Sequence, residues 1–514
     1  CIPHSPSTDF SMIGVDIIAN SSGSHFQINK QERRFELIVN SSKKNGGVYI
    51  YSNLIGCDGG RLYFDGGSFI ALNGNILNEG QRFSLDEIEV IYSLIDLNEV
   101  TSYRSNIKSR CDQSSSSKLI IPRVFLDTNL CDNNQLFDAF YKINPKSYSF
   151  EEEMAHAPAC WMWDYLRRSG GSGFFLPLSG GADSSCVLIM TSLMTRLVYK
   201  HITEYKNEQV LKDLRRIVSD QEYFPKSAEE ILNIILVSTY MGTDYSSEKT
   251  KANSADLAKQ CGSYHLDINI QNIFNTFKEA IEKTLNKEIN FQSQGGSIAE
   301  DLSLQNIQAR IRMCISYLLA GLVNWSRNRK GFLLVLASGN LDEGMMGYLT
   351  KYDCSSADLN PIGGVSKIRL KKFLVYAYEK LGYSELKGVL EIKPSAELTP
   401  GFKQSDEDDM GITYEELSIM GQLRKDYKCG PYSMYKRLLP IWKEKGEDYI
   451  LTKVKLFFRR YSVNRHKMTT ITPSLHVESY GNDDNRFDLR QFLYNTTWEF
   501  QFNKLDKINN KLNI

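Results

Sequence analysis

The first part of the chain, residues 1–125, alternates short apolar runs with polar turns and is predicted to be rich in β-strands. Apolar runs predict strands at 15–19, 47–51, 68–72 and 75–77, and alternation predicts another over 87–97. Asn73 and Gly74 separate two of these strands and indicate a hairpin turn, because both residues tolerate positive φ. Helices are hard to place in this part.

The pattern changes after a linker at 126–160, where the periodicity fades and acidic and polar residues gather. A helix is predicted over 159–168, and short apolar strands then alternate with helical stretches. These strands are predicted at 174–178, 234–238, 265–268 and 332–336. The alternation predicts an α/β domain over 161–514 with a doubly wound parallel sheet, whose ligands bind beyond the carboxyl ends of the strands.

Composition narrows the function classes. The 514 residues suggest two or three domains, and 61 basic residues balance 61 acidic ones, so no net field favours nucleic acid or a membrane as partner. No apolar run is long enough to span a bilayer, and the amino end lacks a signal-peptide pattern. The ten cysteines contain no Cys-x-x-Cys pair, which indicates neither a disulfide framework nor a zinc site and fits a cytoplasmic, reducing setting.

A glycine turn follows the predicted strand 174–178. Its sequence, residues 179–185, is Ser-Gly-Gly-Ala-Asp-Ser-Ser. Gly180 and Gly181 lack Cβ atoms where the backbone must approach a ligand, and their N–H groups with a helix amino terminus suit a pyrophosphate. Asp183 would repel phosphate directly, so we expect it to hold a bridging Mg²⁺. No Walker Gly-Lys-Ser/Thr follows, and the structural alternative is a tight turn with a helix cap.

Further polar residues gather around the later strands. An apolar stripe of Leu304, Ile307, Ile311, Cys314 and Leu318 predicts an amphipathic helix over 304–322. Asn306 and Arg310 share another face of this helix, and an Asn amide with an Arg guanidinium suits a phosphate-bearing ligand. The alternative is that this face is only solvated. Beyond strand 332–336, Glu343 is a second candidate Mg²⁺ ligand, and Lys351 and Lys367 are cations for phosphates. For each of these three, a helix cap or surface ion pair is the alternative.

The turn resembles the pyrophosphatase-type loop of ATP-dependent amidating enzymes, which cleave ATP between the α and β phosphates. Residues 160–500 as a whole are similar to NAD synthetase. The matching segments are the Asn306-x-x-x-Arg310 helix, 343–358, Lys367, 393–398, 404–408 and the pair His466-Lys467. The resemblance implies an adenine nucleotide alpha hydrolase-like fold and amidation of nicotinate adenine dinucleotide (deamido-NAD) with ammonia.

The resemblance also implies residue roles. ATP contacts would be Pro177, Leu178, Ser179, Gly180, Gly181, Ala182, Asp183, Ser184, Ser338, Lys367 and Ser395, with Ser179 and Asp183 taking part in catalysis. Ser338 and Ser395 stand where the family often has threonine. Asp183 and Glu343 match the Mg²⁺ positions. Deamido-NAD contacts would be Asn306, Arg310, Glu343, Thr350, Lys351, Asp353, Asp358, His466 and Lys467.

Residues 20–25, Lys30 and 65–68 resemble the carboxyl-terminal part of a nitrilase-like glutaminase, an αββα sandwich that precedes the synthetase in glutamine-dependent NAD synthetases. Ser24 and Lys30 would lie near the glutamine pocket, or would form a strand-end turn. The register places the family's nucleophilic cysteine upstream of Cys1, so an amino-terminal part is expected to be missing. The intact enzyme would take ammonia from glutamine, whereas this chain is expected to use ammonium only.

Two alternatives stay open from the sequence. One is another synthetase with the same loop, of the asparagine, GMP or tRNA-modifying type. No Gly-x-Cys-x-Gly elbow of the GMP type is present, and zero net charge disfavours a tRNA partner. The other alternative is a non-enzymatic oligomerisation or binding module. A homo-oligomer is expected from the resemblance.

Overall fold

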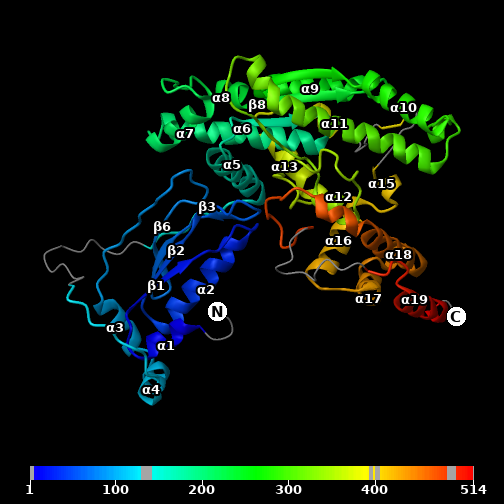
Figure 1. The fold of residues 1–514 in the computed structure, drawn as a ribbon. Helices are drawn as coiled ribbons and strands as arrows, with labels where there is room; N and C mark the ends of the chain where they lie inside the picture. Colours follow the sequence, from blue (N-terminus) through cyan, green and yellow to red (C-terminus); the bar gives the residue numbers. More distant parts are fainter. Residues whose placement is uncertain (1–4, 129–141, 393–397, 400–405, 483–493, 513–514) are drawn as a thin grey trace. The chain divides into compact units, whose positions relative to one another are not determined.

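The computed structural model describes residues 5–128, 142–392, 398–399, 406–482 and 494–512, and the chain divides into two compact units. Unit 1 comprises residues 1–56 and 63–150, and unit 2 comprises 57–62 and 151–514. Each unit has its own sheet and core, and Figure 1 shows the order of the elements along the chain. None of the helices in the described ranges combines the length and apolarity that a bilayer crossing needs.

Unit 1 is built on a four-stranded mixed sheet in the order β1-β2-β5-β6. The elements from residue 5 to 128 are α1 (Pro6–Met12), β1 (Ile17–Ser22), α2 (Lys30–Asn45), β2 (Val48–Asn53), β3 (Ile55–Cys57), β4 (Tyr63–Asp65), β5 (Phe69–Leu72), β6 (Asn75–Glu79), α3 (Asn98–Ser105) and α4 (Lys108–Ser116). The predicted hairpin is confirmed, because β5 and β6 are antiparallel and Asn73 and Gly74 have φ of 49° and 89°.

Helix α2, which the sequence pattern did not predict, covers one face of this sheet (Figure 1). Its buried positions recur with a helical period, at Gln31, Arg34, Ile38, Ser42 and Asn45. Four of the five are polar, so the inward face of α2 does not show as an apolar stripe.

The strand predicted over 87–97 is wrong. This segment is extended but pairs with no strand in the described part of unit 1. Its contacts with the sheet edge use side chains, since Asn78 Nδ2 donates to Tyr92 O at 2.8 Å and Glu89 accepts from Gln81 N at 2.7 Å. Ile91 and Ile95 pack on the sheet face opposite α2. The alternation therefore reflects one packed face and not a strand ladder.

Unit 2 contains a four-stranded parallel sheet in the order β10-β7-β8-β9, which confirms the predicted α/β class. The strands are β7 (Phe174–Pro177), β8 (Leu236–Gly242), β9 (Tyr264–Asn269) and β10 (Leu334–Val335). Phe174, Phe175 and Leu176 are all fully buried, as expected where helices cover both faces. The second strand begins two residues later than predicted because α8 continues to Ile235.

Helices make up most of the rest of unit 2. They are α5 (Phe150–Ser169), α6 (Ala182–Thr203), α7 (Glu208–Val218), α8 (Ala228–Ile235), α9 (Glu248–Cys261), α10 (Gln271–Leu285), η1 (Gln292–Gln294), α11 (Ile298–Ser326), α12 (Leu341–Met346), α13 (Lys367–Lys380), α14 (Leu386–Leu390), α15 (Asp406–Met410), α16 (Tyr414–Lys425), α17 (Pro431–Ile441), η2 (Lys443–Lys445), α18 (Glu447–Val463), η3 (Asn464–Thr470) and α19 (Glu499–Leu512). Helix α5 begins at Phe150, nine residues before the predicted helix start. Helices α12 and α16 to α19 share a further apolar core.

Helix α11 confirms the amphipathic helix predicted over 304–322, but its apolar stripe changes surroundings part-way along. Leu304 and Ile311 are each 3% exposed in a core with α10 and the end of β8. Cys314 is exposed, and the Leu318 side chain is 62% exposed. The apolar stripe is therefore buried only in its first half.

Candidate active site

A glycine turn joins the end of β7 to the amino terminus of α6. Gly180 has a φ of 78°, and a Cβ there would lie 2.0 Å from the carbonyl oxygen of Thr250, so only glycine fits. Ser184 Oγ accepts from the N–H of Ser179 at 3.2 Å and lies 3.0 Å from Ser179 Oγ. The turn thus presents backbone N–H groups and hydroxyls beside the start of a 22-residue helix, an arrangement that favours anions.

Lys367 links this turn to α13. Its backbone N–H donates to Asp342 Oδ2 at 2.8 Å, while its ammonium group forms an ion pair with Asp183 Oδ2. Burial by itself lowers the pKa of Lys367, but the carboxylates of Asp183 and Glu343 outweigh burial and raise that pKa above its usual value. The lysine is therefore charged, and it brings α13 to the aspartate of the turn.

Acidic side chains gather around this ion pair. Glu343 and Asn340 form a capping box at the start of α12, and Asn340 Nδ2 also donates to Asp183 Oδ1 at 3.4 Å. Burial and the Asp183 carboxylate raise the pKa of Glu343 well above its ordinary value. Burial also raises the pKa of Asp342 to about 7 and that of Asp406 above its usual range. So many acidic groups near one lysine favour binding of a further cation.

Two cavities meet at the turn. The smaller, of about 270 Å³, contains Asp183, Glu343, Lys367 and Asp406 in its wall. The larger, of about 610 Å³, extends over the ends of β7 and β8 toward α13 and α14. Five residues line both cavities: Ser179, Gly181, Ala182, Ser338 and Cys354. A ligand that crosses the turn could therefore occupy both, with its most anionic part beside Lys367.

The loop over residues 347–355 forms another wall of the smaller cavity and is bonded to α11. Thr350 Oγ1 donates to Asn306 Oδ1 at 2.7 Å, and Arg310 Nε donates to Lys351 O at 3.1 Å. Within the loop, Asp353 accepts from the N–H of Thr350 at 3.0 Å. The shared helix face predicted for Asn306 and Arg310 therefore exists, and this loop packs on it.

Comparisons with known proteins decide the family. The NAD synthase family matches residues 155–429. The glutamine-dependent NAD(+) synthetase of Dictyostelium discoideum is 46% identical over 510 residues, covering 98% of this chain and 71% of that relative. The enzyme of that name from Saccharomyces cerevisiae is 47% identical over 517 residues, covering 98% of this chain and 72% of its own length. The chain belongs to the glutamine-dependent NAD(+) synthetases.

The fold agrees with this family. The crystal structure of a glutamine-dependent NAD(+) synthetase from Cytophaga hutchinsonii superimposes with a TM-score of 0.73 at 23% identity, covering 96% of this chain and 71% of that one. Family membership disfavours the asparagine, GMP and tRNA-modifying types and the non-enzymatic module that the sequence left open.

The residues predicted to bind ATP in this NAD(+) synthetase lie together. Those lining the two cavities are Pro177, Leu178, Ser179, Gly181, Ala182, Asp183, Ser184, Ser338 and Lys367. Gly180 shapes the turn, while Ser395, with the rest of 393–397, lies outside the described residues, as do Cys1 and residues 404 and 405. Their individual roles stay predictions.

The residues predicted to contact deamido-NAD do not all lie together, unlike those predicted to bind ATP. Six of them meet at the 347–355 loop: Asn306, Arg310, Thr350, Lys351, Asp353 and Lys467. Glu343 lies at the carboxylate cluster. Asp358 accepts from the N–H of Val335 at 2.8 Å and from Tyr317 Oη at 3.1 Å, so it bonds to β10 and α11 and not to the loop. His466 is exposed on η3, beside Lys467.

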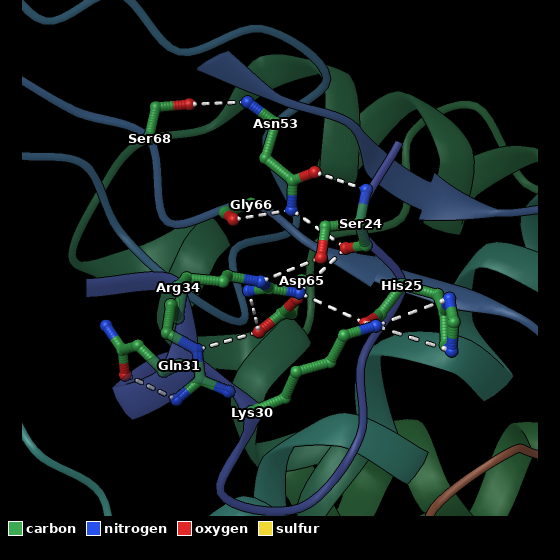
Figure 2. A network of polar contacts seen from close by, with 10 residues as sticks. Ser24, His25, Lys30, Gln31, Arg34, Asn53, Asp65, Gly66 and Ser68 are labelled. Atoms are coloured by element: carbon green, nitrogen blue, oxygen red, sulfur yellow. Dashed lines mark hydrogen bonds and ion pairs between the residues drawn. The ribbon is translucent and has the colours of Figure 1, made fainter. Parts of the chain in front are cut away.

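In unit 1, the predicted glutamine-pocket residues Ser24 and Lys30 belong to a polar network (Figure 2). Arg34 donates to Ser24 Oγ at 3.0 Å and to Ser24 O at 2.7 Å, and it pairs with the buried Asp65 at 2.8 Å. Lys30 Nζ donates to His25 O at 2.9 Å. The network fixes the backbone around Ser24, which suits either a binding pocket or the strand-end turn that was the alternative.

Several residues of the site were not singled out from the sequence. Asn340 joins the start of α12 to Asp183 of α6, and Asp342 joins α12 to the start of α13. Arg312 and Lys371 line the larger cavity. Lys371 follows Lys367 by four residues, a helical spacing that places both on one face. Asp342 offers no such signal, because its role depends on a helix that begins 25 residues later.

Proposed function

We propose that this chain converts deamido-NAD to NAD by ATP-dependent amidation, through an acyl-adenylate, with release of AMP and pyrophosphate. The observation that supports this most is the ion pair of Asp183 and Lys367, where the glycine turn meets a buried cation in the wall of the smaller of two connected cavities. The larger cavity has room for a nucleoside, and the smaller holds the charged groups.

The chemistry follows from the substrate. A nicotinate carboxylate is a poor acyl donor because oxide would have to leave. Attack of a carboxylate oxygen on the α-phosphate forms an acyl phosphate bond and expels pyrophosphate. Ammonia then attacks the carbonyl carbon and loses a proton, and AMP departs with the C–O electron pair. No protein nucleophile is needed, so the chain acts by positioning the reactants and by neutralising phosphate charge with the N–H groups of the turn and Lys367.

Mg²⁺ is proposed as the metal, held by Asp183 and Glu343. In the described ranges no three His, Cys, Asp or Glu side chains form a ready-made metal site. Mg²⁺ is usually held by one or two carboxylates together with substrate phosphates, so two acids at the cavity wall fit it. Burial, and after it the Asp183 carboxylate, raises the pKa of Glu343, and a bound cation would favour its charged form. When bound, the ion would neutralise the phosphates of ATP.

Deamido-NAD is proposed to lie against the 347–355 loop and α11. Arg310 uses Nε to hold Lys351 O, and a guanidinium has two further Nη groups that can bind a phosphate. Thr350 and Lys351 add a hydroxyl and an ammonium group where the loop contacts α11.

Substitution of Asp183 tests the proposal. We expect Asp183→Asn to lower deamido-NAD-dependent ATP–pyrophosphate exchange by about 100-fold or more, because a proposed Mg²⁺ ligand and the ion pair with Lys367 are lost. Asp506→Asn, which removes the acid of the Lys455–Asp506 pair outside both cavities, is the matched control and should retain exchange. Normal exchange in Asp183→Asn would refute the assignment of this turn.

We propose that glutamine supplies the ammonia in the glutamine-dependent reaction, with Ser24 and Lys30 near its pocket. Assays of this chain should compare ammonium with glutamine as the nitrogen donor. NAD formation with ammonium supports the synthetase proposal, and robust use of glutamine would contradict the register assigned to Cys1.

We further propose that the chain forms a homo-oligomer through the exposed face of α11. No charged residue occurs between Met313 and Trp325, and the Leu318 and Trp325 side chains are 62% and 75% exposed. A glycine inside a helix costs about 1 kcal/mol relative to alanine, yet a Cβ at Gly321 would touch nothing in its own chain. A second α11 approaching closely at Gly321 would use that space, and an uncharged face is complementary to itself.

The cytosol is the proposed location. Cys57, Cys186 and Cys354 are thiols without a disulfide, which fits a reducing compartment.

A further inference from the structure

The 3₁₀ helix η3 holds a series of backbone carbonyls at the end of α12. The donors are the side chains of Asn464, Arg465 and Lys467, and the acceptors are the carbonyl oxygens of Met345, Met346, Gly347 and Leu349. Gly347 ends α12 with a φ of 64°, and a Cβ there would lie 2.3 Å from Asn464 Cβ. Helix α12 and the following loop are therefore fitted closely to η3.

Lys467 makes the last two of these contacts. Its Nζ donates to Gly347 O at 2.8 Å and to Leu349 O at 2.7 Å. An ammonium group has three N–H donors, so the loop takes two of them. The side chain is half-buried, and burial lowers the pKa of Lys467 while the nearby Asp353 carboxylate works against this change. To bind a substrate phosphate with more than one donor, Lys467 would have to release the loop.

The loop that Lys467 holds is part of the site. Tyr348, Leu349, Asp353, Cys354 and Ser355 line the smaller cavity. The loop is held from the other side by Asn306 and Arg310 of α11. The end of the loop is also held by Thr472, whose hydroxyl donates to Ser355 O at 2.8 Å. Loss of the Lys467 contacts would therefore free mainly the segment around Gly347 and Leu349, where the loop begins.

From this geometry we infer that Lys467 is a positioning residue, which acts on deamido-NAD by fixing the 347–355 loop of its own chain. This deepens the proposed function, because it assigns a mechanism to a residue predicted to touch the substrate. The expected change in the KM for deamido-NAD rests on that function, whereas the expected change in amide exchange of the loop does not.

Amide hydrogen exchange of the substrate-free chain tests the structural part. The N–H groups of Tyr348, Thr350, Asp353 and Ser355 are bonded within the loop or to α12 and report on its opening. We expect Lys467→Met to speed their exchange about tenfold or more, since charged hydrogen bonds to two carbonyls are lost. Lys467→Arg, which can donate to both carbonyls, should restore much of the protection.

Lys453→Met is the matched control. Lys453 also donates to a backbone carbonyl, Gly411 O at 2.6 Å, but it lies on α18 outside both cavities. This variant should leave exchange of the 347–355 amides unchanged. Exchange of the α6 amides should be equal in all variants, which separates loop opening from global unfolding.

Steady-state kinetics with ammonium test the catalytic part. Lys467→Met should raise the KM for deamido-NAD about tenfold and change the KM for ATP less than twofold, with partial rescue by Lys467→Arg. A higher KM for deamido-NAD with unchanged loop exchange would overturn the inference and make Lys467 a direct substrate contact. Unchanged exchange and kinetics would overturn it as well. If the unsubstituted chain formed no NAD, the proposed function would fail, and the exchange result would still decide whether Lys467 holds the loop.

Discussion

Substitution of the two glycines of the turn, one at a time, separates their roles. Gly180→Ala places a methyl group 2.0 Å from Thr250 O in a backbone with φ of 78°. The left-handed conformation costs about 1–2 kcal/mol and forced overpacking about 1–3 kcal/mol, so we expect a loss of roughly 2–5 kcal/mol. Gly181 has a φ of −86°, and a Cβ added there would lie 3.4 Å from its nearest neighbour, Ser179 Oγ. Its cost should be at most about 1 kcal/mol, because Gly181 is the N-cap of α6.

Thermal unfolding and ATP binding together test this reasoning. In a unit as large as unit 2, each kcal/mol shifts the melting temperature by about 1–1.5 °C. Gly180→Ala should therefore melt several degrees lower and bind ATP poorly, because the N–H groups of the turn are displaced. Gly181→Ala should melt near the unsubstituted chain but bind ATP more weakly, since its methyl group enters the cavities. Equal melting temperatures for both variants would refute the assignment of Gly180 as the constrained position.

Three further predictions follow from the site and from α11. Burial raises the pKa of Asp342 from 3.8 to about 7, so between these pH values the native chain keeps a proton that the unfolded chain releases. This group therefore makes the chain less stable as pH rises from about 4 to 7. In thermal melts from pH 5 to 8, the melting temperature of Asp342→Asn should rise relative to that of the unsubstituted chain up to about pH 7. Parallel curves of melting temperature against pH would contradict this. Glu343→Gln should weaken the binding of Mn²⁺, used in place of Mg²⁺ and measured by electron paramagnetic resonance in the absence of the reaction. An unchanged affinity for Mn²⁺ would exclude Glu343 as a ligand. Leu318→Glu should produce monomers in sedimentation velocity. Leu54→Glu, at an exposed leucine of unit 1, is the control and should not. A chain that is monomeric without substitution would refute the α11 interface.

Local sequence patterns were sufficient for much of the synthetase unit. Buried parallel strands are continuous apolar runs, so the predicted starts of all four lie within two residues of the observed ones. The glycine turn was also recognisable, since residues 179–184 are consecutive and their chemistry is local. In unit 1 the apolar runs located β1, β2, β5 and β6. The pattern missed α2, because most of its inward side chains are polar, and it wrongly predicted a strand over 87–97, where only one face of the segment packs.

The sequence by itself determined the alternating α/β order, the glycine turn and the resemblance to a family, because each can be recognised from short local segments of the chain. Only the tertiary structure decided which distant groups meet. Asp183 and Lys367 are 184 residues apart, and Lys467 reaches carbonyls about 120 residues earlier in the chain. Such contacts depend on how helices pack on the sheet, which no local period encodes. The exposure of α11 also depends on tertiary packing, because the first half of its apolar stripe is buried in a core and the second half is on the surface.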